Sequence, residues 1–236
     1  MSVLLERAGP IARLRLNRPE AHNAFNAEMA ALLVRHVRDL AADPGVHAVV
    51  LSGNGPSFST GLDVKDLGAG TTGVEAFTTW HRMATELRQL AVPLIVAVHG
   101  HCLGGGVMLT LAGDYRLASI DARMGLGAVR HGIVPGSAPE LLPGIVGAAC
   151  ARRLALFGET LDADEALRVG LVDRVVAPDA LEAAATELAQ SASELSPIAV
   201  RETKALLALA GTLDAEQYER AYAEAQQRCL DARAAG

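Results

Sequence analysis

Two short segments, each a loop that runs into a helix, carry the residue types best suited to chemistry. The first is Phe58-Ser-Thr-Gly-Leu-Asp63 and the second is Gly104-Gly-Gly106. A helix N-terminus presents unpaired N–H groups and the positive end of the helix dipole, and glycine lets a ligand oxygen approach that backbone closely. Together the segments could bind the negative oxygen that develops on a reacting carbonyl. One such donor typically lowers a reaction barrier by roughly 3 kcal/mol. A pair of donors can therefore supply much of the catalysis without a special catalytic side chain.

Other patterns of catalytic residues are absent from the sequence. It has no GxSxG, no HExxH, no Walker A lysine and no GxGxxG between a strand and a helix. His99 and His101 place two imidazoles on one side of an extended chain, but a metal site needs a third ligand nearby. We therefore expect no metal site. A glycine triplet at a strand–helix turn also occurs for packing alone, so the spacing by itself does not decide the function.

Composition and charge narrow the class of protein. The chain has 236 residues, of which 50% are hydrophobic, enough for one α/β domain with a helical appendage. The formal net charge is -6, and the Lys and Arg residues are scattered rather than clustered. A nucleic acid partner needs a basic face, so none is expected.

Cysteine usage and hydropathy predict a cytoplasmic location. The three cysteines are far apart and odd in number, which is typical of a reducing compartment. The start of the chain lacks the basic region and long apolar core of a signal peptide. The longest apolar stretch, around 93–98, has the length of a buried strand. We expect a protein that is neither exported nor embedded in a membrane.

Strand and helix patterns alternate over the first two thirds of the chain. Short β-type runs are predicted at 3–6, 11–16, 47–51, 94–98 and 115–119. One helical pattern follows Asn26 and ends at Asp43-Pro44-Gly45, a second ends at Leu90, and a third begins near Gly105. This order predicts a mainly parallel α/β sheet. From Ala138 the pattern is helical except for a strand at 172–176, and we divide the chain into a core, 1–180, and a helical region, 181–236.

Several motifs in order make the chain resemble the enoyl-CoA hydratase/isomerase (crotonase) superfamily. They are Leu16-Asn-Arg-Pro-Glu20, Asn23-Ala24, the two glycine-containing segments, 163–176, and Ser196-Pro197 with Lys204. The resemblance implies a ββα spiral core with a C-terminal helical trimerisation region, assembled as a homotrimer or a dimer of trimers. It also implies an acyl-CoA or acyl-carrier-protein thioester as substrate, with no cofactor beyond the CoA of the substrate.

The same resemblance assigns residues to the substrate. The two oxyanion donors fall on the backbone N–H groups of Leu62 and Gly105. Adenine and pantetheine are expected along Ala24 and the loop formed by Phe58, Ser59, Thr60 and Gly61. Lys204 is placed to reach a CoA phosphate, although a solvated helix lysine is an equally good interpretation.

The sequence departs from the hydratases of this family at two positions. Those enzymes position and deprotonate water with two glutamates, and the corresponding positions hold Met108 and Ala128. A thioether and a methyl group cannot transfer protons. We therefore expect both residues to line the substrate site without acid–base roles, and the usual hydration is disfavoured.

Glu140, shortly after the Pro135-Gly136 turn, is the candidate replacement base, because other branches of the superfamily place a polar side chain near that turn. One base could remove and return a proton while the oxyanion hole holds an enolate. A surface glutamate in a first helical turn is the alternative. His131 is a weaker candidate, followed by His101, His81 and Asp66, because histidine can act as acid or base near neutral pH.

The expected function is therefore isomerisation or decarboxylation of an acyl-CoA-type thioester through a stabilised enolate. Two alternatives stay open. The first is a hydratase with a displaced acid or base, and the second is an acyl-CoA-binding protein without catalysis.

Overall fold

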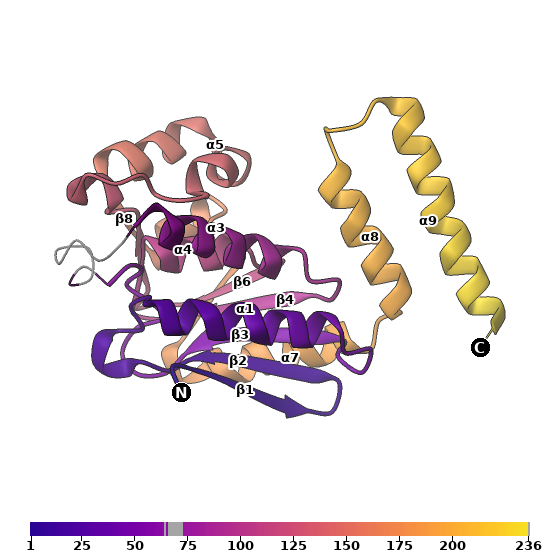
Figure 1. The fold of residues 1–236 in the computed structure, drawn as a ribbon, viewed down its shortest axis with the longest axis horizontal. Helices are drawn as coiled ribbons and strands as arrows, with labels where there is room; N and C mark the ends of the chain where they lie inside the picture. Colours follow the sequence, from indigo (N-terminus) through magenta and orange to yellow (C-terminus); the bar gives the residue numbers. More distant parts are fainter. Residues whose placement is uncertain (64, 66–72, 236) are drawn as a thin grey trace.

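The computed structural model describes residues 1–63, 65 and 73–235, and Figure 1 shows how its elements are arranged. Its main sheet has six strands in the order β1-β2-β3-β4-β6-β9. These are β1 (Val3–Ala8), β2 (Ile11–Leu16), β3 (Ala48–Gly53), β4 (Leu94–Val98), β6 (Tyr115–Ser119) and β9 (Arg174–Val176). β1 and β2 form an antiparallel hairpin, and all other neighbours run parallel. The predicted hairpin and mainly parallel sheet are confirmed.

Helices cover both faces of this sheet (Figure 1). α1 (Ala27–Ala41), α3 (Val74–Arg88) and α4 (Gly105–Leu111) lie on one face, and α7 (Leu181–Ser193) lies on the other. The buried strands supply both cores because successive side chains point to opposite faces. In β3, for example, Val49 faces the first core and Val50 the second.

A second sheet of three short strands was not predicted. It consists of β5 (His101–Leu103), β7 (Arg123–Gly125) and β8 (Thr160–Asp162), with β7 in the centre. Three residues are too few to produce an alternating pattern that a sequence reveals. The short helix η2 (Ala128–His131) follows β7, and α5 (Ala138–Phe157) leads towards β8. This sheet therefore fixes the segments on either side of η2.

The last two helices of the chain extend away from the sheet (Figure 1). α6 (Ala163–Arg168) precedes β9, η3 (Pro178–Ala180) precedes α7, and α8 (Pro197–Leu209) and α9 (Ala215–Ala235) complete the chain, while η1 (Pro19–Ala21) lies near its start. Leu181 and Ala185 of α7 are buried against the sheet. The predicted division after residue 180 thus separates α7 from the sheet that it covers, and only α8 and α9 stand apart. None of the helices in the described part of the chain is long and apolar enough to cross a membrane.

Local capping explains where two of the helices begin. The side chain of Asn26 accepts a hydrogen bond from the N–H of Met29 at 2.9 Å, as the sequence predicted for α1. Asp162 likewise accepts from the N–H of Glu165 at 2.8 Å at the start of α6. Each cap satisfies a backbone donor that the first helical turn leaves without a partner.

One histidine in α1 predicts how stability depends on pH. His36 is 8% exposed, and neither ring nitrogen has a hydrogen-bond partner among the described residues. Burial lowers the pKa of His36 below 6.5, and the positive charge of Arg35 acts in the same direction. The unfolded chain therefore binds a proton at a higher pH than the folded chain does. This contribution to stability is complete above pH 6.5 and is lost as the pH falls towards the folded pKa.

We expect the His36→Leu variant to lose less stability than the wild type between pH 7 and pH 5. The difference is at most about 1.4 kcal/mol for each pH unit within the titration window. Urea unfolding at several pH values measures it. The exposed His81, changed to Leu, is the matched control and is expected to follow the wild type. Parallel pH profiles for wild type and His36→Leu would contradict the assignment.

Candidate active site

Backbone hydrogen bonds join the loop after β3 to the segment after β4. The N–H of Phe58 donates to the carbonyl of His99 at 2.9 Å. The N–H of Ser59 donates to the carbonyl of His101 at 3.1 Å, and the carbonyl of Ser59 accepts from the N–H of Leu103 at 2.8 Å. The two parallel strands thus deliver both glycine-containing segments to the same edge of the sheet.

This pairing brings the segments that carry the two predicted oxyanion donors into contact. Gly61, with a φ of +80°, packs so closely that a Cβ atom on it would lie 2.6 Å from the nitrogen of Gly105. The N–H of Phe25 donates to the carbonyl of Gly61 at 2.6 Å, and the carbonyl of Phe25 accepts from the N–H of Asp63 at 3.1 Å. Leu62 is held between these two bonds.

The N–H groups of Leu62 and Gly105 are available for a ligand. Neither donates a backbone hydrogen bond to an acceptor in the described part of the chain. Gly105 is the first residue of α4, so its N–H has no acceptor within the helix. The preceding Gly104 has a φ of 51° and a ψ of −109°, a conformation that favours glycine. The geometry is that of a pair of backbone donors fixed before any ligand arrives.

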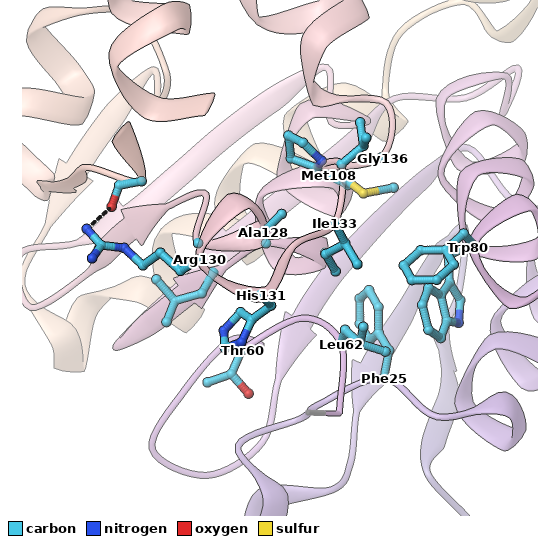
Figure 2. Close-up of a pocket in the computed structure, with 18 of the residues that line it drawn as sticks. Phe25, Thr60, Leu62, Trp80, Met108, Ala128, Arg130, His131, Ile133 and Gly136 are labelled. Carbon is cyan, nitrogen blue, oxygen red and sulfur yellow. Dashed lines mark hydrogen bonds between the residues drawn. The ribbon is translucent and has the colours of Figure 1, made fainter. Parts of the chain in front are cut away.

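A cavity of about 330 Å³ lies next to these donors (Figure 2). Its walls come from the two joined loops, from α3 and α4, and from the segment around η2. The lining residues are Phe25, Thr60, Leu62, Phe77, Trp80, Leu103, Gly104, Gly105, Met108, Gly127, Ala128, Arg130, His131, Ile133, Val134, Pro135, Gly136, Gly158 and Thr160. Most of these side chains are apolar, as in sites that bind a small organic group.

Two polar side chains of the cavity, those of Thr60 and His131, lie close together (Figure 2). Figure 2 shows Thr60, Arg130 and His131 on one side, and Leu62, Phe25 and Trp80 on the other. Nη2 of Arg130 donates to the carbonyl oxygens at the C-terminal end of α5, at 3.2 Å and 3.3 Å. No aspartate or glutamate lines the cavity among the residues that the structure describes. His131 then supplies the imidazole of the described lining, a group that can transfer protons.

Met108 and Ala128 both line the cavity, as predicted. Met108 is 7% exposed, and its thioether packs against Gly136, which leaves no room there for a Cβ atom. Figure 2 shows the side chain of Met108 beside Gly136. The positions that hold glutamates in the hydratases to which the sequence is similar therefore form part of an apolar wall in this chain.

The structure argues against Glu140 as the base. Its side chain is 58% exposed and lies 3.7 Å from the guanidinium of Arg88 on α3. It does not belong to the lining of the large cavity. The reason is local: α5 begins at Ala138, and its first turn directs Glu140 towards α3 and solvent instead of the oxyanion donors. The alternative interpretation, a glutamate on the surface of a first helical turn, fits this arrangement.

Of the four loop residues predicted to bind substrate, one lines the cavity and the other three hold the loop in place. Thr60 lines the cavity. Phe58 and Ser59 are fully buried, and Gly61 contacts Gly105 instead of the cavity. The hydroxyl of Ser59 donates to the carbonyl of Asn23 at 2.8 Å and accepts from the N–H of Gly61 at 3.1 Å. These residues hold the loop in shape, so their predicted direct contact with substrate is not supported.

Ala24 and Lys204 also lie outside the cavity lining. Ala24 is 7% exposed and precedes Phe25, which does line the cavity. Nζ of Lys204 forms an ion pair with Asp114 and donates to the carbonyl of Val92 at 3.1 Å. This site is at the amino-terminal end of β4, whereas the cavity lies beyond the carboxyl end. Within one chain, Lys204 is therefore not placed to bind the CoA phosphate of its own cavity.

The remaining titratable candidates do not meet at the cavity. His101 is exposed, with its ring edge towards His22 at a centroid distance of 6.3 Å, and His81 is exposed on α3. Asp66 lies outside the described residues. No group of three or more His, Cys, Asp or Glu side chains within the described ranges is placed to hold a metal ion.

The cysteine nearest the site, Cys102 of β5, is not suited to act as a nucleophile. Its side chain is buried beside the hydroxyl of Thr110, at 3.3 Å. Burial raises the pKa of the Cys102 thiol to about 12, so the thiolate is not formed near neutral pH.

Several lining residues were not predicted to bind substrate. Phe25 and Ile133 carry no motif, and Phe77 and Trp80 resemble packing residues of an amphipathic helix. Only the fold brings these side chains, which come from three separate segments, to one cavity. No local sequence pattern predicts that they meet.

Comparisons with known proteins agree with this site. The sequence model described as "Enoyl-CoA hydratase/isomerase" matches residues 6–232. The chain is 35% identical over 207 residues to the short-chain-enoyl-CoA hydratase of Clostridium acetobutylicum, covering 86% of this chain and 79% of that protein. It is 36% identical over 209 residues to the (E)-benzylidenesuccinyl-CoA hydratase of Thauera aromatica, covering 86% and 81%.

The fold is also similar to solved structures. The enoyl-CoA hydratase of Mycobacterium smegmatis aligns with a TM-score of 0.92 at 29% identity, covering 98% of this chain and 91% of that one. Such agreement over the whole chain confirms the spiral α/β core that the motifs implied. The chain therefore belongs to the enoyl-CoA hydratase/isomerase family of acyl-CoA enzymes.

Proposed function

We propose that this protein catalyses isomerisation of an acyl-CoA-type thioester through an enolate, in preference to hydration. The observation that carries the proposal is the composition of the cavity: it has two free backbone donors and His131, and no carboxylate among its described lining residues. Hydration by the usual route needs two carboxylates that hold and deprotonate water, and Met108 and Ala128 occupy those positions. Transfer of a proton between two carbons needs only one base.

In the proposed reaction, the thioester oxygen accepts hydrogen bonds from the N–H groups of Leu62 and Gly105. The imidazole of His131 removes a proton from the α-carbon of a 3-enoyl thioester, which lies between the thioester carbonyl and the double bond. The electron pair of that C–H bond moves onto the thioester oxygen, which gives a dienolate. The protonated imidazole then delivers a proton, which it can first exchange with solvent, to the γ-carbon, so the double bond shifts and the substrate loses one proton and gains one. The oxyanion donors lower the barrier because they bind charge that exists only in the dienolate.

Decarboxylation is the second candidate, and the apolar lining favours it. In that reaction the bond between the α-carbon and a carboxylate breaks, its electron pair forms the enolate, and a proton then adds to the α-carbon. The step that forms the enolate needs no base. A carboxylate that enters an apolar cavity loses part of its hydration, which favours release of CO₂.

Deuterium exchange with mass spectrometry tests the proposal. We expect 3-enoyl-CoA substrates in deuterated water to isomerise and exchange protons, and crotonyl-CoA to show no comparable hydration. His131→Asn is expected to lower the rate about 100-fold or more, the usual contribution of a general base. The control variants are Glu140→Gln, outside the cavity, and His81→Asn, an exposed histidine, and both are expected to retain the wild-type rate.

Each other outcome identifies a different activity. Turnover of malonyl-CoA without isomerisation would favour decarboxylation. Fast hydration by the wild type would contradict the proposal and revive a hydratase with a displaced acid or base. Tight thioester binding with neither exchange nor turnover would favour an acyl-CoA-binding protein without catalysis.

The assembly and the location remain part of the proposal. We propose a homotrimer or a dimer of trimers in the cytoplasm, acting on CoA or carrier-protein thioesters without a further cofactor, a nucleic acid or a membrane. The exposed side chains of Leu207 on α8 and of Tyr222 and Leu230 on α9 support an assembly through these helices. Sedimentation of the purified protein measures the assembly.

A further inference from the structure

Most of the phenylalanine and tryptophan side chains of this chain line the cavity. The sequence contains four Phe and one Trp. Phe25, Phe77 and Trp80 line the cavity, whereas Phe58 is buried in the core and Phe157 is exposed on the surface. In a chain with so few aromatic residues, three at one cavity indicate a role beyond general packing.

Two of these rings form an ordered pair on α3. Phe77 and Trp80 are three residues apart, so they lie on the same face of the helix. Their ring centroids are 5.3 Å apart with an interplanar angle of 76°, an edge-to-face arrangement. Trp80 is 8% exposed, so its ring is held firmly in the wall.

The third ring reaches the oxyanion donors. A Cβ atom on Gly105 would lie 2.5 Å from the ring of Phe25, so this ring lies directly against the backbone of Gly105. The backbone of Phe25 is also bonded to Gly61 in the loop that carries Leu62. Figure 2 shows Phe25, Leu62 and Trp80 together on the side of the cavity away from Thr60 and His131. An acyl group whose carbonyl oxygen is held by the two donors therefore meets aromatic side chains at its first carbons.

We infer that the acyl group carries a planar ring, such as a phenyl ring, which binds against Phe25, Phe77 and Trp80. The inference deepens the proposed function and uses it only to place the thioester oxygen. A flat ring can make edge-to-face or offset contacts with these side chains, and each contact strengthens binding by about 2- to 10-fold beyond buried area alone. A straight alkyl chain lacks these contacts and loses rotational freedom when it is bound.

The test compares two CoA thioesters with the same number of acyl carbons, 3-phenylpropanoyl-CoA and nonanoyl-CoA. Trp80 is the only tryptophan in the chain and lines the cavity, so its fluorescence reports binding to the full-length protein directly. We expect the phenyl thioester to bind at least about 5-fold more tightly. Phe77→Leu is expected to reduce this ratio to less than about 2-fold, and Tyr115→Leu, on the opposite face of the sheet, is expected to keep it.

Equal or tighter binding of nonanoyl-CoA to the wild type would overturn the inference. So would an unchanged ratio in both Phe77→Leu and a second variant, Phe77→Met, each shown to be folded by circular dichroism. Because binding is measured without turnover, the result is independent of the reaction. A clear preference for the ring with no isomerisation would contradict the proposed function alone, and isomerisation without the preference would contradict this inference alone.

Discussion

Replacing Gly61 by alanine is expected to lower the rate of isomerisation or proton exchange by about 100- to 1,000-fold, the usual effect of losing one oxyanion donor. The added Cβ atom would lie 2.6 Å from both the nitrogen of Gly105 and the carbonyl oxygen of Leu103. These backbone atoms can relieve the clash only by moving, and that movement would displace the N–H donor of Gly105. The rate, measured by mass spectrometry with a 3-enoyl-CoA substrate, reports the change.

A matched variant separates this steric effect from backbone strain. Gly61 has a φ of +80° and Gly211 a φ of +77°, but a Cβ atom on Gly211 would meet no atom within 4 Å. Both changes to alanine place a side chain in the left-handed region, at a cost of roughly 1 kcal/mol or more. Only Gly61→Ala is expected to lose activity. Similar losses in both variants would mean that stability, and not the oxyanion hole, limits the rate.

The parallel sheet could be predicted because its strands are buried on both faces. The run Leu94–Val98 is continuously apolar, and the structure has a strand with the same bounds. The three-residue strands of the smaller sheet have no such signature. Arg123 and Gly125 lie in β7 because β5 and β8 pair with them, which is a consequence of tertiary structure. Local pattern therefore revealed the main sheet but not the small one that supports the site.

A similar difference separates the parts of the site. The resemblance assigned the two donors to Leu62 and Gly105, and the structure places the segments that carry them side by side. The direction of a side chain depends on neighbouring elements. Glu140 illustrates this: it follows the expected turn in the sequence, but in the structure its exposed side chain lies beside Arg88 of α3.

Distance along the chain limited the remaining predictions. Phe25 lies in the loop before α1 and Trp80 lies on α3, and only the fold brings both to one cavity. Lys204 lies on α8 and pairs with Asp114, which precedes β6 beside the start of β4. Neither local sequence predicts this ion pair. The resemblance therefore indicated which backbone donors to place at the site, whereas the shape of the acyl site required the structure.

The double variant Met108→Glu/Ala128→Glu is expected to gain hydration of crotonyl-CoA, at least about 100-fold above the wild type. Both positions line the cavity beside the oxyanion donors. A glutamate has nearly the length of the methionine that now packs against Gly136, so its carboxylate can occupy the same space. Two carboxylates there would hold a water molecule and transfer its protons, and general acid–base catalysis typically contributes 100- to 10,000-fold. Loss of the absorbance of the enoyl thioester measures the reaction.

The control for this gain is Met108→Gln/Ala128→Gln, which has nearly the same shape but cannot transfer protons. It is expected to bind crotonyl-CoA without hydrating it. The hydration rate of each single glutamate variant is expected to remain well below that of the double variant, because the two carboxylates act on the same water molecule. Hydration in the double glutamate variant alone would mean that the fold and the oxyanion hole are those of a hydratase, and that the residues at 108 and 128 decide the reaction. If the double variant binds crotonyl-CoA and does not hydrate it, the loss of these glutamates is not what separates this protein from the hydratases. The aromatic side chains of Phe25, Phe77 and Trp80 would then be the feature that keeps a reactive water molecule out of the cavity.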